Sequence, residues 1–369
     1  MFQSKQTQST IDRSKLKLRR ARKDDLDDQL NLIGNMRERT QDERMREIEA
    51  YKMTWKWRYE INPNNPDGEP QIWVIEYDGR VIGQYPTIPV VLYCGGKILT
   101  GSWASASVVD PQWRGQGLGT ILIKEGWWKS SNISLVTGMT EGAINLYRKL
   151  KYISLGRLRK MIRCCNKNIT GSEPIGKRLL RSFLSLYSHS VTKCFRLKAK
   201  SFSEFDFIKV AHFDDEVSNF ALDVCKGYRI IERRDKNYLN WRFIDNPVRN
   251  YSIYIGKSKG TILGYIVLRK SDLNGVIADI LTRSDDKNAM KFLIQKGIEY
   301  FKELNVNYIV CLATDRNLKK TLIKAGFLPN IFTGKADDFM IHLNSGDLDE
   351  RLLGNLNNWY LTTTLSDRE

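Results

Sequence analysis

A glycine-rich run beside an arginine is the part of this sequence whose residue types and spacing could do chemistry. Residues 114–120 read Arg-Gly-Gln-Gly-Leu-Gly-Thr. Glycine lacks a Cβ, so the backbone can turn its amide groups inward and let them approach a ligand. Arginine adds a fixed positive charge that suits phosphate oxygens. The run therefore predicts a site for a pyrophosphate group.

The segments on either side of this loop predict how it is positioned. Residues 98–109 are rich in small and β-branched residues, as strands are, and Asp110 and Pro111 end this strand. Apolar residues then recur with helical spacing from Leu118 to Trp128. A helix that begins here points its unpaired N–H groups and the positive end of its dipole at the loop. The predicted order is strand, glycine loop, helix.

The spacing excludes two other phosphate loops. A GxGxxG dinucleotide loop would need its third glycine where Thr120 stands. The GxxxxGK[ST] loop needs a Gly-Lys pair, which this segment does not have. The pattern that remains is Arg-x-x-Gly-x-Gly, formed by Arg114, Gly117 and Gly119.

The chain also repeats itself, because three landmarks recur in the same order. They are a strand followed by paired aspartates, a Trp-Arg-aromatic element that ends in Asn-Pro, and a hairpin with a turn that contains glycine. The first copies span 18–25, 57–63 and 72–85, and the second copies span 208–215, 241–247 and 251–265. We infer two copies of one α/β unit, residues 14–163 and 202–343, followed by a tail over 344–369.

A basic connector, residues 164–201, joins the two units. Apolar residues recur every four positions from Leu179 to Phe195, which predicts a helix. We expect this helix to bridge the units with its apolar face buried against both. The alternative is a helix that binds a membrane surface or nucleic acid.

The pattern of one arginine and two glycines resembles the coenzyme A signature of the GNAT acyltransferase superfamily, (Gln/Arg)-x-x-Gly-x-(Gly/Ala) between the family's fourth strand and third helix. Residues 143–152 resemble the family's A-x-x-L-Y-x-x-x-G-F helix, with Lys151 in place of the glycine and Tyr152 in place of Phe. The strand and acidic helix start at residues 16–26 also fit. The resemblance covers the first unit. It implies two tandem GNAT-like domains of the α/β (α+β) class, each with a mixed, mostly antiparallel sheet flanked by helices.

The resemblance also implies a mechanism, in which an amine attacks the thioester of acyl-coenzyme A directly. The backbone of Val108 and Val109 would bind the pantetheine arm, and an amide there would stabilise the oxyanion. Tyr147 would protonate the leaving thiolate; the alternative is a tyrosine that only packs on the core. Catalysis is thus assigned to Tyr147 and Val109. Cofactor binding is assigned to Val108, Val109, Arg114, Gly115, Gln116, Gly117, Leu118, Gly119, Thr120 and Asn145.

The general base is not assigned by the sequence. Many relatives place an acid on the strand before the loop, but residues 102–107 contain no carboxylate. Asp110 and Glu141 are the nearest acids. Asp110 also suits turn formation before a proline, and Glu141 suits a helix start. A chain of water molecules could serve instead.

The second unit lacks the glycine loop. After its strand at 276–281, residues 282–288 contain no glycine and two acids, which would repel a pyrophosphate. Leu322 stands where Tyr147 stands in the first copy. We expect this unit to keep the fold without the chemistry and to shape the acceptor cleft. Residues that could line that cleft, or pack beneath the hairpin instead, are Trp55, Trp57, Trp241 and Arg242.

The leading hypothesis is an acyl-coenzyme A-dependent N-acyltransferase that uses acetyl-coenzyme A or another acyl-coenzyme A. Its acceptor would be a small polar amine, for example an amino sugar or its nucleotide conjugate. One alternative is a Fem-type ligase that takes aminoacyl-tRNA, which the basic connector would suit and the intact loop argues against. The other is a non-catalytic protein that binds acyl-coenzyme A or scaffolds a partner.

Composition limits these hypotheses only loosely. The formal charge of +17 favours phosphate-rich partners but does not choose among nucleic acid, anionic lipid, nucleotide-linked substrates and coenzyme A. The six cysteines form no CxxC pair and the three histidines are far apart, so we expect no metal site and a reducing cytoplasm. No apolar run is long enough for a membrane helix.

Overall fold

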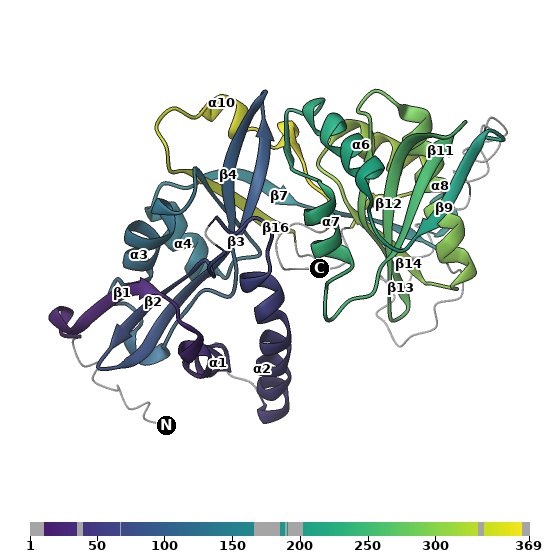
Figure 1. The fold of residues 1–369 in the computed structure, drawn as a ribbon. Helices are drawn as coiled ribbons and strands as arrows, with labels where there is room; N and C mark the ends of the chain where they lie inside the picture. The colour runs from purple at the N-terminus through teal and green to yellow at the C-terminus, as the bar shows by residue number, and fades with distance from the viewer. Residues whose placement is uncertain are drawn as a thin grey trace.

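The computed structural model describes residues 11–34, 40–66, 68–165, 185–188, 190, 202–330 and 336–363. Two sheets flanked by helices make up this part of the chain, which confirms the α/β class expected from the sequence (Figure 1). The connector expected over 164–201 lies almost entirely outside the described residues. None of the helices in the described part has the length and apolar character needed to cross a membrane.

The first half of the chain builds most of a ten-stranded sheet with the main order β1-β2-β3-β4-β6-β16-β7. β5 and β10 pair with β3, and β17 pairs with β10. Along the main path only β4 and β6 are parallel. The strands are β1 (Leu16–Arg20), β2 (Ile72–Tyr77), β3 (Arg80–Cys94), β4 (Lys97–Ala104), β5 (Val108–Val109), β6 (Ile133–Thr137), β7 (Ile153–Leu158), β10 (Ile230–Glu232), β16 (Asp337–Leu343) and β17 (Trp359–Tyr360).

Helices cover both faces of this sheet because its strands present apolar residues on both sides. Val81 belongs to the core that includes Leu32 of α1 and Tyr51 of α2, whereas the next residue, Ile82, packs with Leu118 of α3. Successive side chains of a strand point to opposite faces, so the two helix pairs lie on opposite sides. These helices are α1 (Leu26–Gly34), α2 (Gln41–Trp55), α3 (Leu118–Ile121) and α4 (Glu141–Lys149). Shorter helical turns continue α2 to Glu60 and α3 to Lys129.

The second half builds a seven-stranded sheet in the order β15-β8-β14-β13-β12-β11-β9. The strands are β8 (Lys160–Cys164), β9 (Phe205–Val210), β11 (Ser252–Ser258), β12 (Thr261–Ser271), β13 (Asn274–Thr282), β14 (Tyr308–Leu312) and β15 (Leu328–Pro329). The helices are α6 (Asp215–Lys226), α7 (Lys236–Phe243), α8 (Lys287–Glu303), α9 (Arg316–Lys324) and α10 (Glu350–Leu353). As in the first sheet, one parallel pair, β13 with β14, interrupts an antiparallel ladder.

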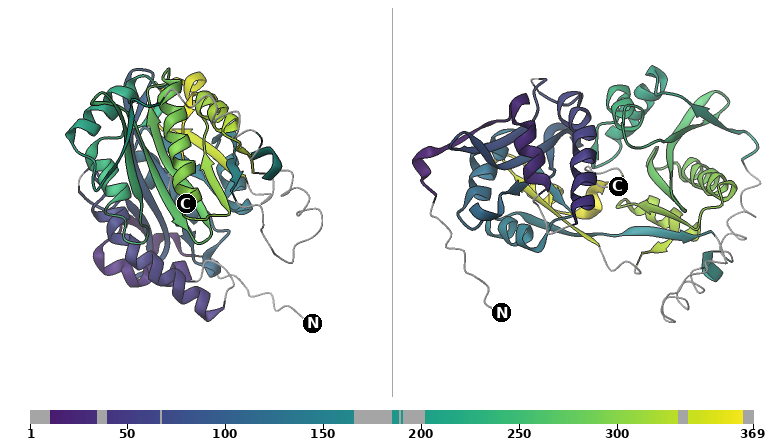
Figure 2. Two further views of the ribbon diagram at one scale, coloured as in Figure 1. Left: turned by 90° about the vertical axis from the view of Figure 1, so that its right-hand side faces the viewer. Right: turned by 90° about the horizontal axis from the view of Figure 1, so that it is seen from below.

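The two sheets exchange a strand, and this exchange cuts across the linear boundaries expected from the sequence. β8 follows β7 directly along the chain, but it crosses into the second sheet and pairs with β14 and β15 (Figure 2). In return β16 enters the first sheet and pairs with β6 on one side and β7 on the other. Residues 160–163 and 337–343 therefore lie in the sheet opposite to the unit that the sequence assigned them to.

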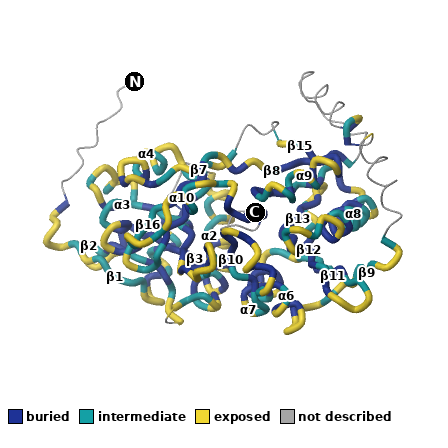
Figure 3. The backbone as a smooth tube through the Cα atoms, turned by 90° about the horizontal axis from the view of Figure 1, so that it is seen from above, coloured by how far each residue is buried: buried dark blue, intermediate teal, exposed yellow. Residues whose placement is uncertain are grey.

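The repeated Trp-Arg element joins the halves face to face. The rings of Trp57 and Trp241 stack at a centroid distance of 5.0 Å. Each indole N–H donates to the other residue's carbonyl, at 2.7 Å from Trp57 and 2.8 Å from Trp241. Both residues are buried, so they pack against each other and do not line an open cleft. One continuous apolar core runs through the buried segments of both halves (Figure 3).

Candidate cofactor site

The glycine loop lies between β5 and α3 with its backbone exposed. Gly117 precedes the helix with a φ of 84°, and Gly115 has a φ of 80°. A side chain at either position would be strained, which explains glycine there. The amides of Thr120 and Ile121 bond to the Gly117 carbonyl. Among the described residues, no protein acceptor faces the amides of Gly115, Gly117, Leu118 and Gly119.

The third glycine of the loop lies close to α4. A Cβ on Gly119 would lie 3.3 Å from Cδ2 of Leu146, so that side chain would have to shift by a few tenths of an ångström. Asn145, one residue earlier on α4, is exposed. The loop glycines therefore have two different roles, backbone freedom at 115 and 117 and close helix approach at 119.

Two arginines flank the loop, and sequence reasoning found only one of them. The Nε atom of Arg114 donates to the Val109 carbonyl at 3.0 Å, which fixes the side chain beside the loop. Arg13 reaches the loop from the N-terminal side, with its Nη2 atom 3.9 Å from the position that a Cβ on Gly117 would take. The amide of Ile11 donates to Oε1 of Gln116 at 2.8 Å and holds this segment in place. Arg13 lies about a hundred positions from the loop along the chain, and no local motif marks it.

Strand β4, which precedes the loop, separates from its parallel neighbour β6 close to the loop. Pairing between β4 and β6 runs from Gly101 to Trp103, and the chain then turns at Ala106, which has a φ of 43°. β5 pairs instead with β3, Val108 opposite Gln84 and Val109 opposite Gly83.

This register decides which backbone amide is available at the parting strands. The amide of Asp110 donates to the Ile82 carbonyl at 2.9 Å. In an antiparallel ladder the bonding direction alternates from one residue to the next. The amide of Val108 is therefore directed at β3, and that of Val109 points away from β3 toward the gap in the ladder. The buried side chain of Val108 packs in the core that includes Leu32 and Tyr51, whereas Val109 packs against the core that includes Leu118 and Tyr147.

Tyr147 lies on α4 with its hydroxyl 2.6 Å from that of Tyr85 on β3. Burial raises the pKa of Tyr147 to about 12, so this hydroxyl keeps its proton at neutral pH. The Tyr147 ring also packs against Tyr152 at a centroid distance of 4.7 Å. The Tyr85 side chain also hydrogen-bonds Ser107, the residue before β5, which places this pair of hydroxyls next to the start of that strand. No local pattern in the sequence marks Tyr85, since its contact with Tyr147 depends on how β3 and α4 pack together.

The two acids considered as bases have ordinary local roles. Asp110 accepts from the amide of Gln112 at 3.1 Å and ends the strand, as a turn residue does. Glu141 lies exposed in the first turn of α4, whose N-cap is Thr140. Neither Asp110 nor Glu141 is therefore assigned the role of general base. No group of three or more His, Cys, Asp or Glu in the described part of the chain could hold a metal ion.

In the second half, a short turn without glycine precedes the corresponding helix, α8. Thr282 pairs with Gly264 as Val109 pairs with Gly83, but α8 begins at Lys287, after a shorter turn. The carboxylate of Asp286 accepts from the amides of Asn288 at 3.1 Å and Ala289 at 2.9 Å. An internal carboxylate thus occupies the helix start that the first half leaves open.

The corresponding gap between strands in the second half is filled by the C-terminal segment. Pairing of β13 with β14 stops at Ile277 and Cys311, and residues 359–363, all buried, lie between the strands beyond that point. The hydroxyl of Thr363 accepts from the Leu312 amide at 2.9 Å and donates to the Ile277 carbonyl at 2.8 Å. The second half therefore has neither the loop nor an open gap between its parallel strands.

Comparisons with known proteins agree with this architecture. Residues 68–154 match the family model described as an acetyltransferase (GNAT) domain. A GCN5-related N-acetyltransferase from Anabaena variabilis ATCC 29413 is 14% identical, with 89% of this chain and 73% of that chain covered and a TM-score of 0.56. One from Kribbella flavida is 13% identical, with 89% and 71% covered and a TM-score of 0.54. Saccharomyces cerevisiae N-myristoyltransferase with bound myristoyl-CoA is 15% identical, with 90% and 83% covered and a TM-score of 0.51. No curated protein sequence matches.

The first half therefore carries a GNAT domain, and the chain has the fold of the GNAT N-acyltransferases. This confirms the family expected from the glycine loop and the tyrosine-bearing helix. The matched residues 68–154 contain the loop, the parting strands and α4.

Proposed function

We propose that this chain is an acyl-coenzyme A-dependent N-acyltransferase, with acetyl-coenzyme A as the leading donor and a small polar amine as acceptor. The observation that carries the proposal is the cluster of amides without a protein acceptor at Gly115, Gly117, Leu118 and Gly119, next to the outward amide of Val109. Amides at a helix start favour a pyrophosphate, and a lone amide beside parting strands suits a thioester carbonyl.

The residues that fit coenzyme A divide between its two ends. The loop amides, Arg114, Arg13 and the side chains of Gln116 and Thr120 would hold the pyrophosphate end. Val108 and Val109 would line the pantetheine arm, and Asn145 is exposed on the adjoining face of α4. When bound, acyl-coenzyme A supplies an activated acyl group.

Each catalytic residue would then have a defined role. The incoming amine forms a C–N bond to the thioester carbon while the Val109 amide donates to the oxygen that becomes negative. As the C–S bond breaks, Tyr147 gives its proton to the leaving sulfur. Its pKa of about 12 keeps that proton available at neutral pH. The ammonium proton of the attacking amine leaves through solvent, since no acid lies in residues 104–109.

The proposal extends to the acceptor and the compartment. An amino sugar or its nucleotide conjugate is our leading acceptor, on the resemblance of the tandem arrangement to transferases of surface polysaccharide synthesis. We expect no nucleic-acid partner. The five cysteines in the described part of the chain are all free, which supports a cytoplasmic enzyme.

Calorimetry with coenzyme A and acetyl-coenzyme A tests the proposal. Gly117→Val places a strained side chain among the loop amides, and we expect the dissociation constant to rise at least about tenfold, the loss of one charge-assisted hydrogen bond. Gly260→Val is the matched control, because Gly260 has a φ of 82° in the open turn between β11 and β12 of the second half. Wild-type protein that gives no heat with either ligand, or Gly117→Val protein that binds normally, would reject the proposal.

A non-catalytic coenzyme A-binding protein is the second candidate, favoured by the missing carboxylate before the loop. A thiol-release assay with acetyl-coenzyme A and a panel of amino sugars and other small amines separates it from an enzyme. Turnover that requires an amine supports catalysis, and tight binding without turnover across the panel supports the second candidate. Retention of tRNA at about 200 mM salt would instead favour a tRNA-dependent ligase, because phosphate contacts weaken steeply with salt.

A further inference from the structure

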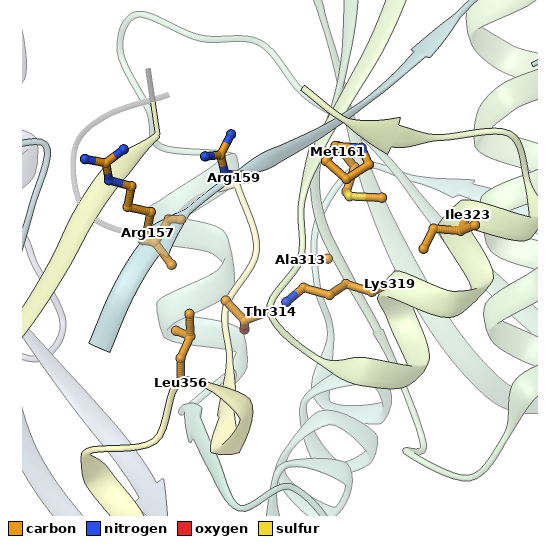
Figure 4. A pocket seen from close by; sticks show the side chains of 10 residues that line it. Arg157, Arg159, Met161, Ala313, Thr314, Lys319, Ile323 and Leu356 are labelled. Atoms are coloured by element: carbon orange, nitrogen blue, oxygen red, sulfur yellow. The ribbon is translucent and has the colours of Figure 1, made fainter. Parts of the chain in front are cut away.

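A second cavity, of ≈ 260 Å³, lies where the chain crosses from one half to the other (Figure 4). Its walls come from the junction of β7 and β8, from the segment after β14, from α9 and from Leu356 near the C-terminus. α9 is the counterpart in the second half of the helix that carries Tyr147. The cavity is therefore separate from the glycine loop and is built by both halves together.

Among the described residues that line this cavity, three have cationic side chains and none has a carboxylate. Arg157 approaches Asp338 only at 3.7 Å and stays 61% exposed. Arg159 forms no ion pair with any residue that the structure describes. Lys319 extends across the cavity toward Thr314 in Figure 4. A concave site with an unbalanced positive charge favours an anion.

Lys319 is a cation whose charged form is disfavoured by burial. It is partly buried, and burial lowers its pKa, because removal from water disfavours the charged amine. The opposing group is Asp315, whose carboxylate is already used to cap α9 through the Leu318 amide at 2.8 Å. An anion bound in the cavity would restore the charge balance around Lys319.

The other residues that line the cavity indicate what the uncharged part of the ligand is like. Leu158 and Met161 are buried beneath the cavity, while Ile323 is 40% exposed at its edge. Thr314 offers no free hydroxyl, since it donates to the Trp359 carbonyl and accepts from the Leu361 amide. The cavity therefore combines an apolar floor with a cationic rim. Its volume of ≈ 260 Å³ favours a small ligand over a nucleotide or a lipid chain.

We propose that this cavity binds a small organic phosphate, with the phosphate at Lys319, the side chains of Arg157 and Arg159 as further cations on the rim, and the carbon body on Leu158 and Met161. Two guanidinium forks match phosphate oxygens better than point charges would. The site does not depend on coenzyme A binding at the glycine loop.

Calorimetry with inorganic phosphate, glycerol 3-phosphate, glucose 6-phosphate and glucose tests this proposal. We expect at least one phosphate ester to bind saturably, more tightly than inorganic phosphate, while glucose does not bind. Lys319→Ala should weaken that ester at least about tenfold, as the loss of a charged contact predicts. Lys320→Ala is the matched control, because Lys320 is exposed on the same helix and does not line the cavity.

Three results would overturn the proposal: no saturable binding of either ester, equal affinity for inorganic phosphate and the esters, or unchanged binding in Lys319→Ala. Gly117→Val separates the two sites, because it should leave ester binding intact whether or not coenzyme A binds. Arg159→Ala provides a second variant if Lys319→Ala melts at a lower temperature than wild type.

Discussion

At the scale of single residues, the least expected feature is the pair of buried hydroxyls at Tyr147 and Tyr85. The sequence offered two interpretations of Tyr147, a proton donor and a packed aromatic, and the structure is compatible with both. The ring is buried against Tyr152, and its hydroxyl faces Tyr85 beside β5. Packing positions the hydroxyl, so the two interpretations do not exclude each other.

Removal of the Tyr147 hydroxyl tests its proposed role. We expect Tyr147→Phe to lower kcat by about 100-fold or more, the usual contribution of a positioned acid, while the dissociation constant for acetyl-coenzyme A changes little. Tyr152→Phe is the control, because Tyr152 is equally buried and its hydroxyl accepts from Trp128 at 3.1 Å. Equal turnover in Tyr147→Phe and wild type would leave Tyr147 as a packing residue.

Burial of Tyr147 also predicts a pH dependence of stability. The folded-state pKa of about 12 lies above the value of about 10 expected in the unfolded chain. The stabilisation is therefore complete below pH 10 and is lost as the pH rises toward 12, by up to about 3 kcal/mol from this residue. Urea unfolding on both sides of pH 10 should show a smaller loss for Tyr147→Phe than for wild type. Equal slopes would contradict this assignment.

Arg13 is the residue that the sequence could not identify, because only the fold brings it to the loop. We expect Arg13→Ala to raise the dissociation constant for coenzyme A by about tenfold, the loss of one charge-assisted phosphate contact. Lys15→Ala is the control, because it removes the same charge two residues away. The Lys15 side chain pairs with Asp78 at 3.3 Å. If both variants bind coenzyme A equally, Arg13 has no specific role.

At the scale of elements, local signals predicted the loop well and the strand partners poorly. The glycines at 115, 117 and 119 marked the loop in the sequence, and the structure adds the reasons for them, positive φ at 115 and 117 and a close contact at 119. β8 and β16 carry ordinary strand patterns, but nothing in a strand's own sequence states which sheet it joins. Their exchange, and the C-terminal segment between β13 and β14, are long-range pairings that local patterns do not encode.

The C-terminal segment makes a prediction at this scale. Trp359, Tyr360 and Leu361 are all buried. Removal of residues 359–369 would open the gap between β13 and β14 and expose the apolar surface that these three side chains cover. At about 1.5–3 kcal/mol for each large side chain, we expect a loss of more than about 5 kcal/mol in the free energy of unfolding. Removal of residues 364–369 alone keeps the segment and is the control. Equal urea midpoints for the two truncations would show that the segment does not stabilise the second half.

At the scale of the whole molecule, the two halves share structure in four places. They exchange β8 and β16, they stack Trp57 on Trp241, and β10 pairs with β3. Glu232 of the second half also accepts from the indole of Trp103 in the first at 2.7 Å. The repeat in the sequence predicted two similar units, and its landmarks include the element that joins them. At Trp57 and Trp241 two segments with the same Trp-Arg pattern meet each other reciprocally, as equivalent surfaces do in a symmetric dimer.

This sharing predicts that the chain unfolds as one unit. Neither sheet is complete without a strand from the other half, since β6 and β7 meet only through β16. We expect circular dichroism and tryptophan fluorescence to give one coincident urea transition. A fragment of residues 1–165 should bind a hydrophobic dye and fold only when residues 166–369 are co-expressed. Two separate transitions, or a sharp transition in the isolated fragment, would mean that each half completes its own sheet in solution, which the pairing of β16 on both its edges does not allow.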